Sequence, residues 1–261
     1  MSRIENAKVL QNGQIAPDIY DLRIHQPEQA VQAVAGQFLG IYTGDAAMLL
    51  PRPLSICEID ADKGVLRVIY RVVGDGTREI AKAVPGDTLR VLGPLGNGYE
   101  GILTANDASK TLIVGGGLGV PPMLGLAARI REARPDGHIA VYLGFRDKSQ
   151  VILEDDFKKY ADKVIVCTDD GSYGAKGHAV GVLPQEADII YGCGPAPMLK
   201  ALSQYATTHN IPCFVSVEEH MACCVGTCLA CAVKVSENGN AVNKRACHDG
   251  PVFNAKEVVW E

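Results

Sequence analysis

The chain has 261 residues, of which 47% are hydrophobic and 21% charged, and its formal net charge is −5. This composition can bury a core and allows about two compact domains of ~150 residues, which excludes a largely disordered chain. Net acidity with only 25 Lys and Arg argues against a nucleic-acid-binding protein. The sequence contains no apolar run of about 18 residues, so no membrane span is expected. The first residues lack the apolar stretch of a signal peptide, which predicts a cytoplasmic protein.

The N-terminal part, up to about Ile102, shows short apolar runs with a period of two, interrupted by glycine, proline and aspartate. One such run covers residues 65–72, and another covers 88–92 after the turn residues 85–87. Alternation between turn signals is typical of antiparallel strands. We therefore expect residues 1–101 to form an antiparallel β-barrel.

The next part of the chain alternates strand-like and helical patterns. Buried-strand runs occur at residues 111–114, 139–143, 164–167 and 188–191. The first run leads through a glycine loop into a helix expected at 122–133. The last leads through a second loop into a helix that starts near Pro195. Strands alternating with helices predict a parallel α/β domain over residues 102–212.

The last segment, residues 213–261, is too short for a conventional core and holds most of the cysteines. The chain has nine in all, and five crowd its last forty residues: Cys223, Cys224, Cys228, Cys231 and Cys247. In a reducing compartment such a group favours metal or redox chemistry over disulfides. The segment is therefore predicted to be a small metal module.

The spacing of these cysteines is C-x4-C-x2-C with a distant fourth cysteine, which is the plant-type pattern for a [2Fe–2S] cluster. The predicted ligands are Cys223, Cys228, Cys231 and Cys247. Cys224 is interpreted as a non-ligand, because a C-x3-C start would break the spacing. The alternatives are a four-cysteine zinc site, which usually has short C-x2-C pairs at both ends, or unrelated buried thiols.

Two glycine loops follow predicted strands and open predicted helices. The first carries Gly115, Gly116, Gly117 and Gly119, and the second is Gly192-Cys193-Gly194-Pro195. Free N–H groups at a helix start attract phosphate, and glycine permits its close approach. The first loop is neither a dinucleotide-binding G-x-G-x-x-G fingerprint nor a P-loop, so a tight structural turn is the alternative. Together, on neighbouring strand ends, they would form one nucleotide-binding crevice.

These features resemble the ferredoxin–NADP reductase superfamily, in which an FAD-binding barrel precedes a nucleotide-binding α/β domain. The resemblance includes an R-x-x-[ST] flavin motif, a following flavin-contact strand, a small phosphate-holding loop, and GGGxGxxP and CGP elements. It implies FAD binding by Arg52, Pro53, Leu54, Ser55, Ile69, Tyr70, Arg71, Gly76 and Thr77. It likewise implies NAD binding by Gly115, Gly116, Gly117, Gly119, Cys193, Gly194 and Pro195, with Cys193 beside the nicotinamide.

The whole chain further resembles one family, the electron transfer subunits of dihydroorotate dehydrogenase B. The resemblance rests on residues 218–223 and on the tail 247–253, and it departs from the family at His220 and Cys224, where arginine and glycine are usual. It implies a heterotetramer of two such subunits with two FMN-containing catalytic subunits. Electrons would pass from that FMN through the [2Fe–2S] cluster and FAD to NAD⁺, in pyrimidine (UMP) synthesis. The dihydroorotate site would lie on the partner.

Asp169 and Asp170 follow the third α/β strand, where NADP-using members of the superfamily usually carry serine and arginine. Acidic residues there would repel a 2′-phosphate and favour NAD, although a solvated turn is the alternative. His178, His209 and His248 are interpreted as surface or structural residues. Rival functions are the reductase subunit of a sulfhydrogenase or of a ferredoxin:NAD(P) oxidoreductase, or a non-enzymatic regulatory protein that binds a metal and a nucleotide.

Overall fold

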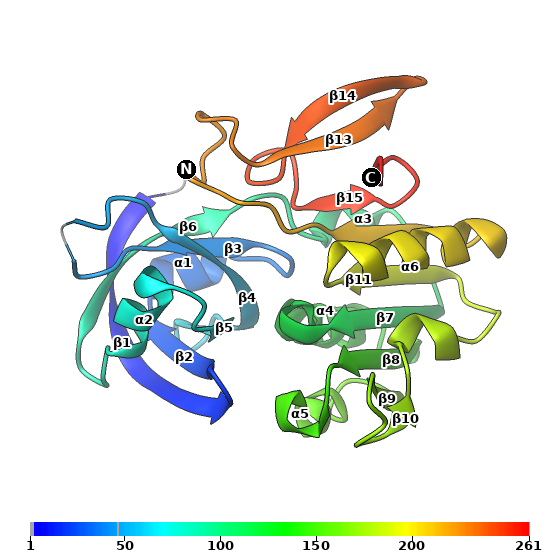
Figure 1. The fold of residues 1–261 in the computed structure, drawn as a ribbon, viewed down its shortest axis with the longest axis horizontal. Helices are drawn as coiled ribbons and strands as arrows, with labels where there is room; N and C mark the ends of the chain where they lie inside the picture. Colours follow the sequence, from blue (N-terminus) through cyan, green and yellow to red (C-terminus); the bar gives the residue numbers. More distant parts are fainter. Residues whose placement is uncertain (1–2, 46, 261) are drawn as a thin grey trace.

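Six antiparallel strands near the N-terminus close into a barrel, in the spatial order β1-β2-β5-β4-β3-β6 (Figure 1). The computed structural model describes residues 3–45 and 47–260. The strands are β1 (Arg3–Ala16), β2 (Ile19–His25), β3 (Phe38–Ile41), β4 (Arg52–Asp60), β5 (Val65–Arg71) and β6 (Thr88–Leu95), with the short helices α1 (Pro27–Gln32) and α2 (Asp75–Ala81). The predicted barrel is confirmed.

The period of two places alternate side chains of β5 on opposite faces of the barrel wall. Leu66, Val68 and Tyr70 belong to the cluster that fills the barrel. Ile69 belongs to a different cluster, shared with the α/β half. One strand therefore serves both the barrel interior and the contact with its neighbour.

The second half of the molecule is a seven-stranded sheet in the order β10-β9-β8-β7-β11-β12-β15, flanked by helices, as predicted for an α/β domain. Its strands are β7 (Lys110–Gly116), β8 (His138–Phe145), β9 (Lys163–Thr168), β10 (Ala175–Lys176), β11 (Ile189–Cys193), β12 (Cys213–Ser216) and β15 (Val252–Asn254). The helices are α3 (Glu100–Thr104), α4 (Val120–Ala133), α5 (Glu154–Phe157) and α6 (Ala196–Thr208), with 3₁₀ turns η1 (Gly117–Gly119), η2 (Lys148–Gln150) and η3 (Ala179–Val182).

Helix α4 begins at Val120, two residues before the predicted start. Pro121 and Pro122 do not delay it, because the first turn of a helix needs no backbone N–H from these positions. Neighbouring strands in the sheet run parallel, except that β15 pairs antiparallel with β12.

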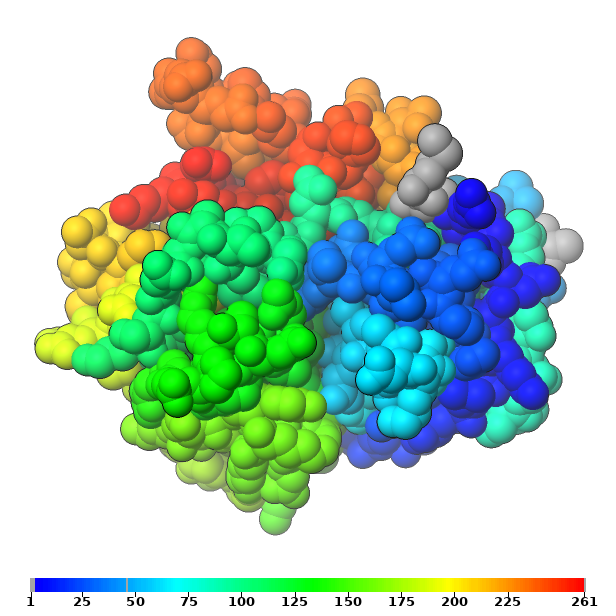
Figure 2. Space-filling view, turned by 180° about the vertical axis from the view of Figure 1, so that it is seen from behind, coloured from blue at the N-terminus to red at the C-terminus, as the bar shows by residue number. Residues whose placement is uncertain are grey.

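The C-terminal segment is divided between the sheet and a separate hairpin. The hairpin strands β13 (Ala232–Glu237) and β14 (Asn240–Arg245) form their own two-stranded sheet. By contrast, β12 and β15 extend the main sheet, so that sheet crosses the boundary predicted after residue 212. The space-filling view shows the orange and red C-terminal residues along one edge, above both halves (Figure 2).

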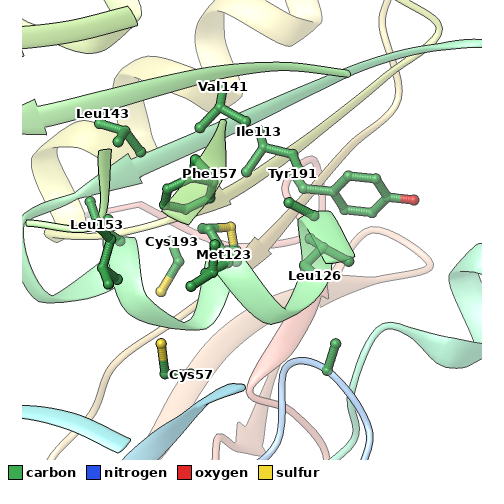
Figure 3. Packing of buried hydrophobic residues seen from close by; sticks show 14 of the residues in the cluster. Cys57, Ile113, Met123, Leu126, Val141, Leu143, Leu153, Phe157, Tyr191 and Cys193 are labelled. Atoms are coloured by element: carbon green, nitrogen blue, oxygen red, sulfur yellow. The ribbon is translucent and has the colours of Figure 1, made fainter. Parts of the chain in front are cut away.

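The barrel and the α/β half share a hydrophobic cluster at their junction. Cys57 and Ile69 from the barrel pack in it with Met123 and Leu126 of α4; Figure 3 shows Cys57 on the barrel side of this helix. A β-carbon on Gly125 would lie 2.7 Å from the Cys57 carbonyl oxygen, so α4 and β4 are in direct contact. No helix of the described chain is long and apolar enough to cross a membrane.

Candidate functional site

A cavity of about 690 Å³ lies between the two halves of the molecule, where the two glycine loops meet. Strands β7 and β11 are direct neighbours, with Gly115 opposite Cys193, so the two glycine loops leave adjacent strand ends. This juxtaposition confirms the expected arrangement. The cavity is lined by Gly116, Gly117, Leu118 and Gly119 from the first loop and by Gly194, Pro195, Pro197 and Met198 from the second.

Close packing between the loops explains why they need glycine. A β-carbon on Gly119 would lie 2.2 Å from the carbonyl oxygen of Cys193, and one on Gly116 would lie 2.5 Å from Met198 Sδ. Gly194 adopts φ +159°, at the edge of the region that favours glycine. Each glycine thus keeps space that a larger residue would fill.

Two predicted nucleotide residues lie beneath the crevice surface. Gly115 is buried against Val120. Cys193 is only 1% exposed and packs in the junction cluster (Figure 3). Burial raises the pKa of the Cys193 thiol well above its usual range, so it stays protonated. Cys193 therefore acts as a neutral packing residue at the end of β11.

The other wall of the crevice comes partly from residues that sequence reasoning did not assign to the nucleotide. Arg71, at the end of β5, donates to Gln150 Oε1 at 2.5 Å across the cavity, and its Nε is buried without a partner. Glu218 lines the cavity just after β12, and desolvation raises its pKa. Only the sheet order, with β12 beside β11, brings Glu218 to this place.

Of the two acidic residues after β9, only Asp169 lines the crevice. Its Oδ1 lies 3.1 Å from His178 Nδ1, so His178 belongs to the same wall. Asp170 instead accepts hydrogen bonds from the N–H and the hydroxyl of Ser172, which closes an exposed turn. The structure thus separates a crevice-facing carboxylate from a turn-forming one.

Three of the predicted flavin residues, Arg52, Gly76 and Thr77, come together where β4 begins and α2 starts. Arg52 lies directly over Gly76, where a β-carbon would be 1.9 Å from its Nε, so any side chain at residue 76 would displace the Arg52 guanidinium. The Arg52 guanidinium also donates to the carbonyl oxygen of Leu50 at 2.6 Å. Thr77 Oγ1 accepts from the N–H groups of Val73 and Gly74 at 3.0 and 3.2 Å and fixes the preceding loop.

The remaining flavin-motif residues point in different directions. Tyr70 is 1% exposed; its ring stacks on Tyr20, and its hydroxyl donates to Asn12 Oδ1 at 3.0 Å, so it belongs to the barrel interior. Ser55 is half-buried on β4, opposite Phe38. The half-buried Pro53 and Leu54 pair with Gly40 and Leu39 of β3.

The four predicted ligand cysteines approach one another in two pairs. Cys231 Sγ and Cys247 Sγ are 3.2 Å apart and buried, although they are 16 positions apart in the sequence. The side chains of Cys223 and Cys228 interact with each other nearer the surface. Within the described ranges, no three His, Cys, Asp or Glu side chains converge as they would around a single metal ion. A [2Fe–2S] cluster takes two thiolates per iron, and this pairing matches that requirement.

The loop also directs backbone N–H groups at the sulfurs. Val225 and Cys228 donate to Cys223 Sγ at 3.5 and 3.4 Å, and Gly226 donates to Cys247 Sγ at 3.1 Å. Burial acts to raise the pKa of Cys223, but hydrogen bonds from the backbone of Val225, Cys228 and Thr227 and from the Cys228 thiol outweigh it and lower the pKa to about 6. Burial raises the pKa of Cys224 to about 12. The donor set fits an iron–sulfur cluster, with Cys224 outside it.

Comparison with known families matches two parts of the chain. Residues 6–99 match the oxidoreductase FAD-binding domain, which corresponds to the barrel. Residues 218–259 match the iron–sulfur cluster binding domain of dihydroorotate dehydrogenase B. The second match contains all four paired cysteines.

Comparison with whole proteins extends the similarity to the full length. The electron transfer subunit of dihydroorotate dehydrogenase B (NAD⁺) from Desulforamulus reducens is 39% identical over 267 residues, covering 100% of both chains. The subunit of the same name from Streptococcus mutans is 40% identical, covering 98% of each chain.

Two solved structures have a fold similar to that of this chain. An NADH-dependent reduced ferredoxin–NADP oxidoreductase superposes with a TM-score of 0.83 at 33% identity, covering 97% of this chain and 90% of its own. A ferredoxin–NADP⁺ reductase from Neisseria gonorrhoeae gives a TM-score of 0.67 at 18% identity, covering 80% of this chain and 92% of its own, which supports the fold alone.

Proposed function

Because this chain belongs to the family of electron transfer subunits of dihydroorotate dehydrogenase B, we propose that it carries electrons from an FMN-containing catalytic subunit to NAD⁺. The route uses a [2Fe–2S] cluster and FAD, and the process serves pyrimidine (UMP) synthesis. One observation carries the proposal. A single chain combines a two-loop nucleotide crevice, an FAD-type barrel and two thiol pairs. The predicted segments 1–101, 102–212 and 213–261 would bind FAD, NAD and the cluster respectively.

The cluster would be held by Cys223 and Cys228 on one iron and by Cys231 and Cys247 on the other. When bound, it exchanges single electrons, while flavin can take single electrons and release a hydride. The protein's part is to hold the thiolates and to direct N–H groups at them. The Gly226 N–H at Cys247 Sγ supports this role.

The flavin would be held at the barrel wall by the predicted flavin residues. The Arg52 guanidinium suits a phosphate, because its fork donates two parallel hydrogen bonds. Its position over Gly76 leaves it beside the loop that Thr77 fixes. Ser55 is half-buried further along the same strand, where its hydroxyl can hydrogen-bond the flavin ring. Tyr70 would contribute by packing behind this wall, because both its ring and its hydroxyl already have partners.

The nucleotide would lie in the crevice, with its phosphates at the loop of residues 116–119 and at the start of α6. Asp169 is placed to accept a ribose hydroxyl and to repel a 2′-phosphate, which favours NAD over NADP. Arg71 and Glu218 line the same crevice from the barrel and from β12. The chain thereby brings flavin and nucleotide sites to one junction.

The partner would be the dihydroorotate dehydrogenase catalytic subunit, in a heterotetramer of two plus two. The cluster loop offers a largely apolar surface for it, since residues 221–233 contain no Asp, Glu, Lys, Arg or His and Leu229 is 64% exposed. All nine cysteines are free thiols, as expected in the reducing cytoplasm, where we place the complex.

Co-purification with native partners tests this proposal, followed by an assay of dihydroorotate-dependent NAD⁺ reduction. We expect a complex that contains FMN, FAD and iron and reduces NAD⁺ when given dihydroorotate. Recovery of a hydrogenase partner, or a complex that couples NADH to ferredoxin without responding to dihydroorotate, would overturn it. The second outcome is the alternative favoured by the NADH-dependent oxidoreductase of similar fold.

A further inference from the structure

Arg245, at the end of β14, anchors the turn that carries the last cysteine. Its Nε and a terminal nitrogen donate to the two carboxylate oxygens of Asp249 at 2.8 and 2.9 Å, and its backbone N–H donates to the same carboxylate at 2.8 Å. The Arg245 carbonyl oxygen accepts from the N–H groups of His248, Asp249 and Gly250. Backbone and side-chain hydrogen bonds of Arg245 therefore both close the turn that contains Cys247.

The other arm of the same guanidinium reaches the cysteine loop. Arg245 Nη1 donates to the Gly226 carbonyl oxygen at 3.1 Å, and the Gly226 N–H donates to Cys247 Sγ at 3.1 Å. Gly226 has φ +81°, and a β-carbon there would lie 2.9 Å from the His248 Cβ. Glycine is thus required for the two segments to meet, and Arg245 is the side chain that ties them.

We propose that Arg245 is a positioning residue for the cluster: its fork, oriented by Asp249, holds Gly226 so that the Gly226 N–H points at Cys247 Sγ. Hydrogen bonds to the sulfurs of an iron–sulfur cluster are among the factors that set its reduction potential. Such a bond stabilises the extra negative charge of the reduced form and so raises the potential. This role rests on the proposed function, because it requires the cluster to be bound.

The contacts of Arg245 distinguish a role in orienting the Gly226 N–H from a purely electrostatic effect on the cluster. Arg245 and Asp249 form a two-point ion pair, with donor–acceptor distances of 2.8 and 2.9 Å, so the pair adds no net charge beside the cysteines. What the pair supplies to the loop is a fixed direction for one hydrogen bond. A lysine at this position would keep the positive charge but could not donate to Asp249 and Gly226 in the same planar arrangement.

The experiment is a redox titration of the full-length protein, followed by electron paramagnetic resonance of the reduced cluster. It compares wild type with Arg245→Lys, Arg245→Gln, Asp249→Asn and the control Lys244→Gln. Lys244 is the neighbouring residue on β14 and pairs with Glu237 rather than with the loop. We expect both Arg245 variants to shift the midpoint potential to more negative values and Lys244→Gln to match wild type. Asp249→Asn should shift it less far than Arg245→Gln, because the loss of orientation is partly offset by the removal of a negative charge beside the cluster.

An Arg245→Lys potential equal to that of wild type would overturn the proposal, because charge alone would then be sufficient. If Arg245→Gln purifies without iron, Arg245→Lys and Asp249→Asn decide the outcome. A wild-type protein without any cluster signal would instead refute the proposed function, so the two failures are distinguishable.

Discussion

Cys224 shows how one residue's surroundings decide its chemistry. It lies between ligand-spaced cysteines, yet its side chain is 1% exposed and its backbone adopts φ +62°, a region where non-glycine residues are strained. Its pKa is raised to about 12, while that of its neighbour Cys223 is lowered to about 6. Geometry favours Cys223 as the ligand, because its Sγ accepts hydrogen bonds from the N–H groups of Val225 and Cys228. The pKa alone does not distinguish ligands here, since that of the predicted ligand Cys247 is also raised to about 12.

We expect Cys228→Ser to lose most of the bound iron and the visible absorbance of the cluster, because one iron would lack a thiolate. Cys224→Ala should keep both, since it removes a thiol but leaves the four predicted ligands. Iron analysis and absorbance spectra of the two purified variants provide the measurement. Iron loss from Cys224→Ala at the level of Cys228→Ser would show that the ligand assignment is wrong.

Asp169 and Asp170 differ in the same way, one facing the crevice and one closing a turn. We expect Asp169→Asn to lower the ratio of kcat/KM for NADH over NADPH at least about tenfold. Unit charges about 4 Å apart interact by roughly 1–4 kcal/mol between bulk water and a protein surface. Dye reduction with each cofactor measures this ratio. Asp170→Asn is the control, and an equal change in both variants would contradict the assignment of Asp169.

At the scale of elements, the glycine loops are defined by contacts between strands rather than by their own sequence. Gly119 has ordinary helical backbone angles, φ −76° and ψ −12°, so alanine there would not strain the chain itself. Its restriction comes from the Cys193 carbonyl oxygen on the neighbouring strand. The sequence of the loop alone therefore does not show which of its glycines the packing requires.

We expect Gly119→Ala to destabilise the protein by about 1–3 kcal/mol, because the new methyl group meets a backbone atom and overpacks the junction. The displacement of α4 from β11 should also raise the KM for NADH. Gly181→Ala is the matched control, since a β-carbon there would meet no atom within 4 Å. Chemical denaturation and steady-state dye reduction test both effects, and equal stability of the two variants would contradict the packing argument.

The two halves of the molecule meet through both apolar and charged contacts. Arg67 of the barrel pairs with Asp21 at 2.9 Å and with Glu58 at 2.5 Å, and lies 3.9 Å from Asp156 of α5 in the other half. The Arg67–Asp156 contact thus adds an ion pair to the apolar cluster at the junction. The cluster loop, by contrast, exposes apolar side chains to solvent.

We expect Leu229→Asp to weaken association with the catalytic subunit at least about tenfold, because burying an unpaired carboxylate at the interface costs desolvation free energy. Val182→Asp is the control, because Val182 is an exposed residue of η3 in the α/β half. Sedimentation or titration calorimetry with purified partner gives the two dissociation constants. Unchanged binding by Leu229→Asp would place the interface elsewhere on the molecule.

Patterns confined to short stretches could be read from the sequence. Alternation predicted the barrel strands, strand–loop–helix rhythm predicted the α/β half, and C-x4-C-x2-C spacing predicted the cluster loop. Each depends on residues a few positions apart, whose mutual geometry is fixed by backbone regularity.

What lies far apart in the chain was decided by the tertiary structure alone. Strand order brings Glu218 to the crevice, and barrel closure turns Tyr70 inward while leaving Arg71 beside Gln150. The turn at Arg245 carries Cys247 to Gly226 across 21 residues. Local periodicity specifies which side chains share a face, but which faces then meet depends on how the whole chain packs its apolar surface and satisfies its buried polar groups.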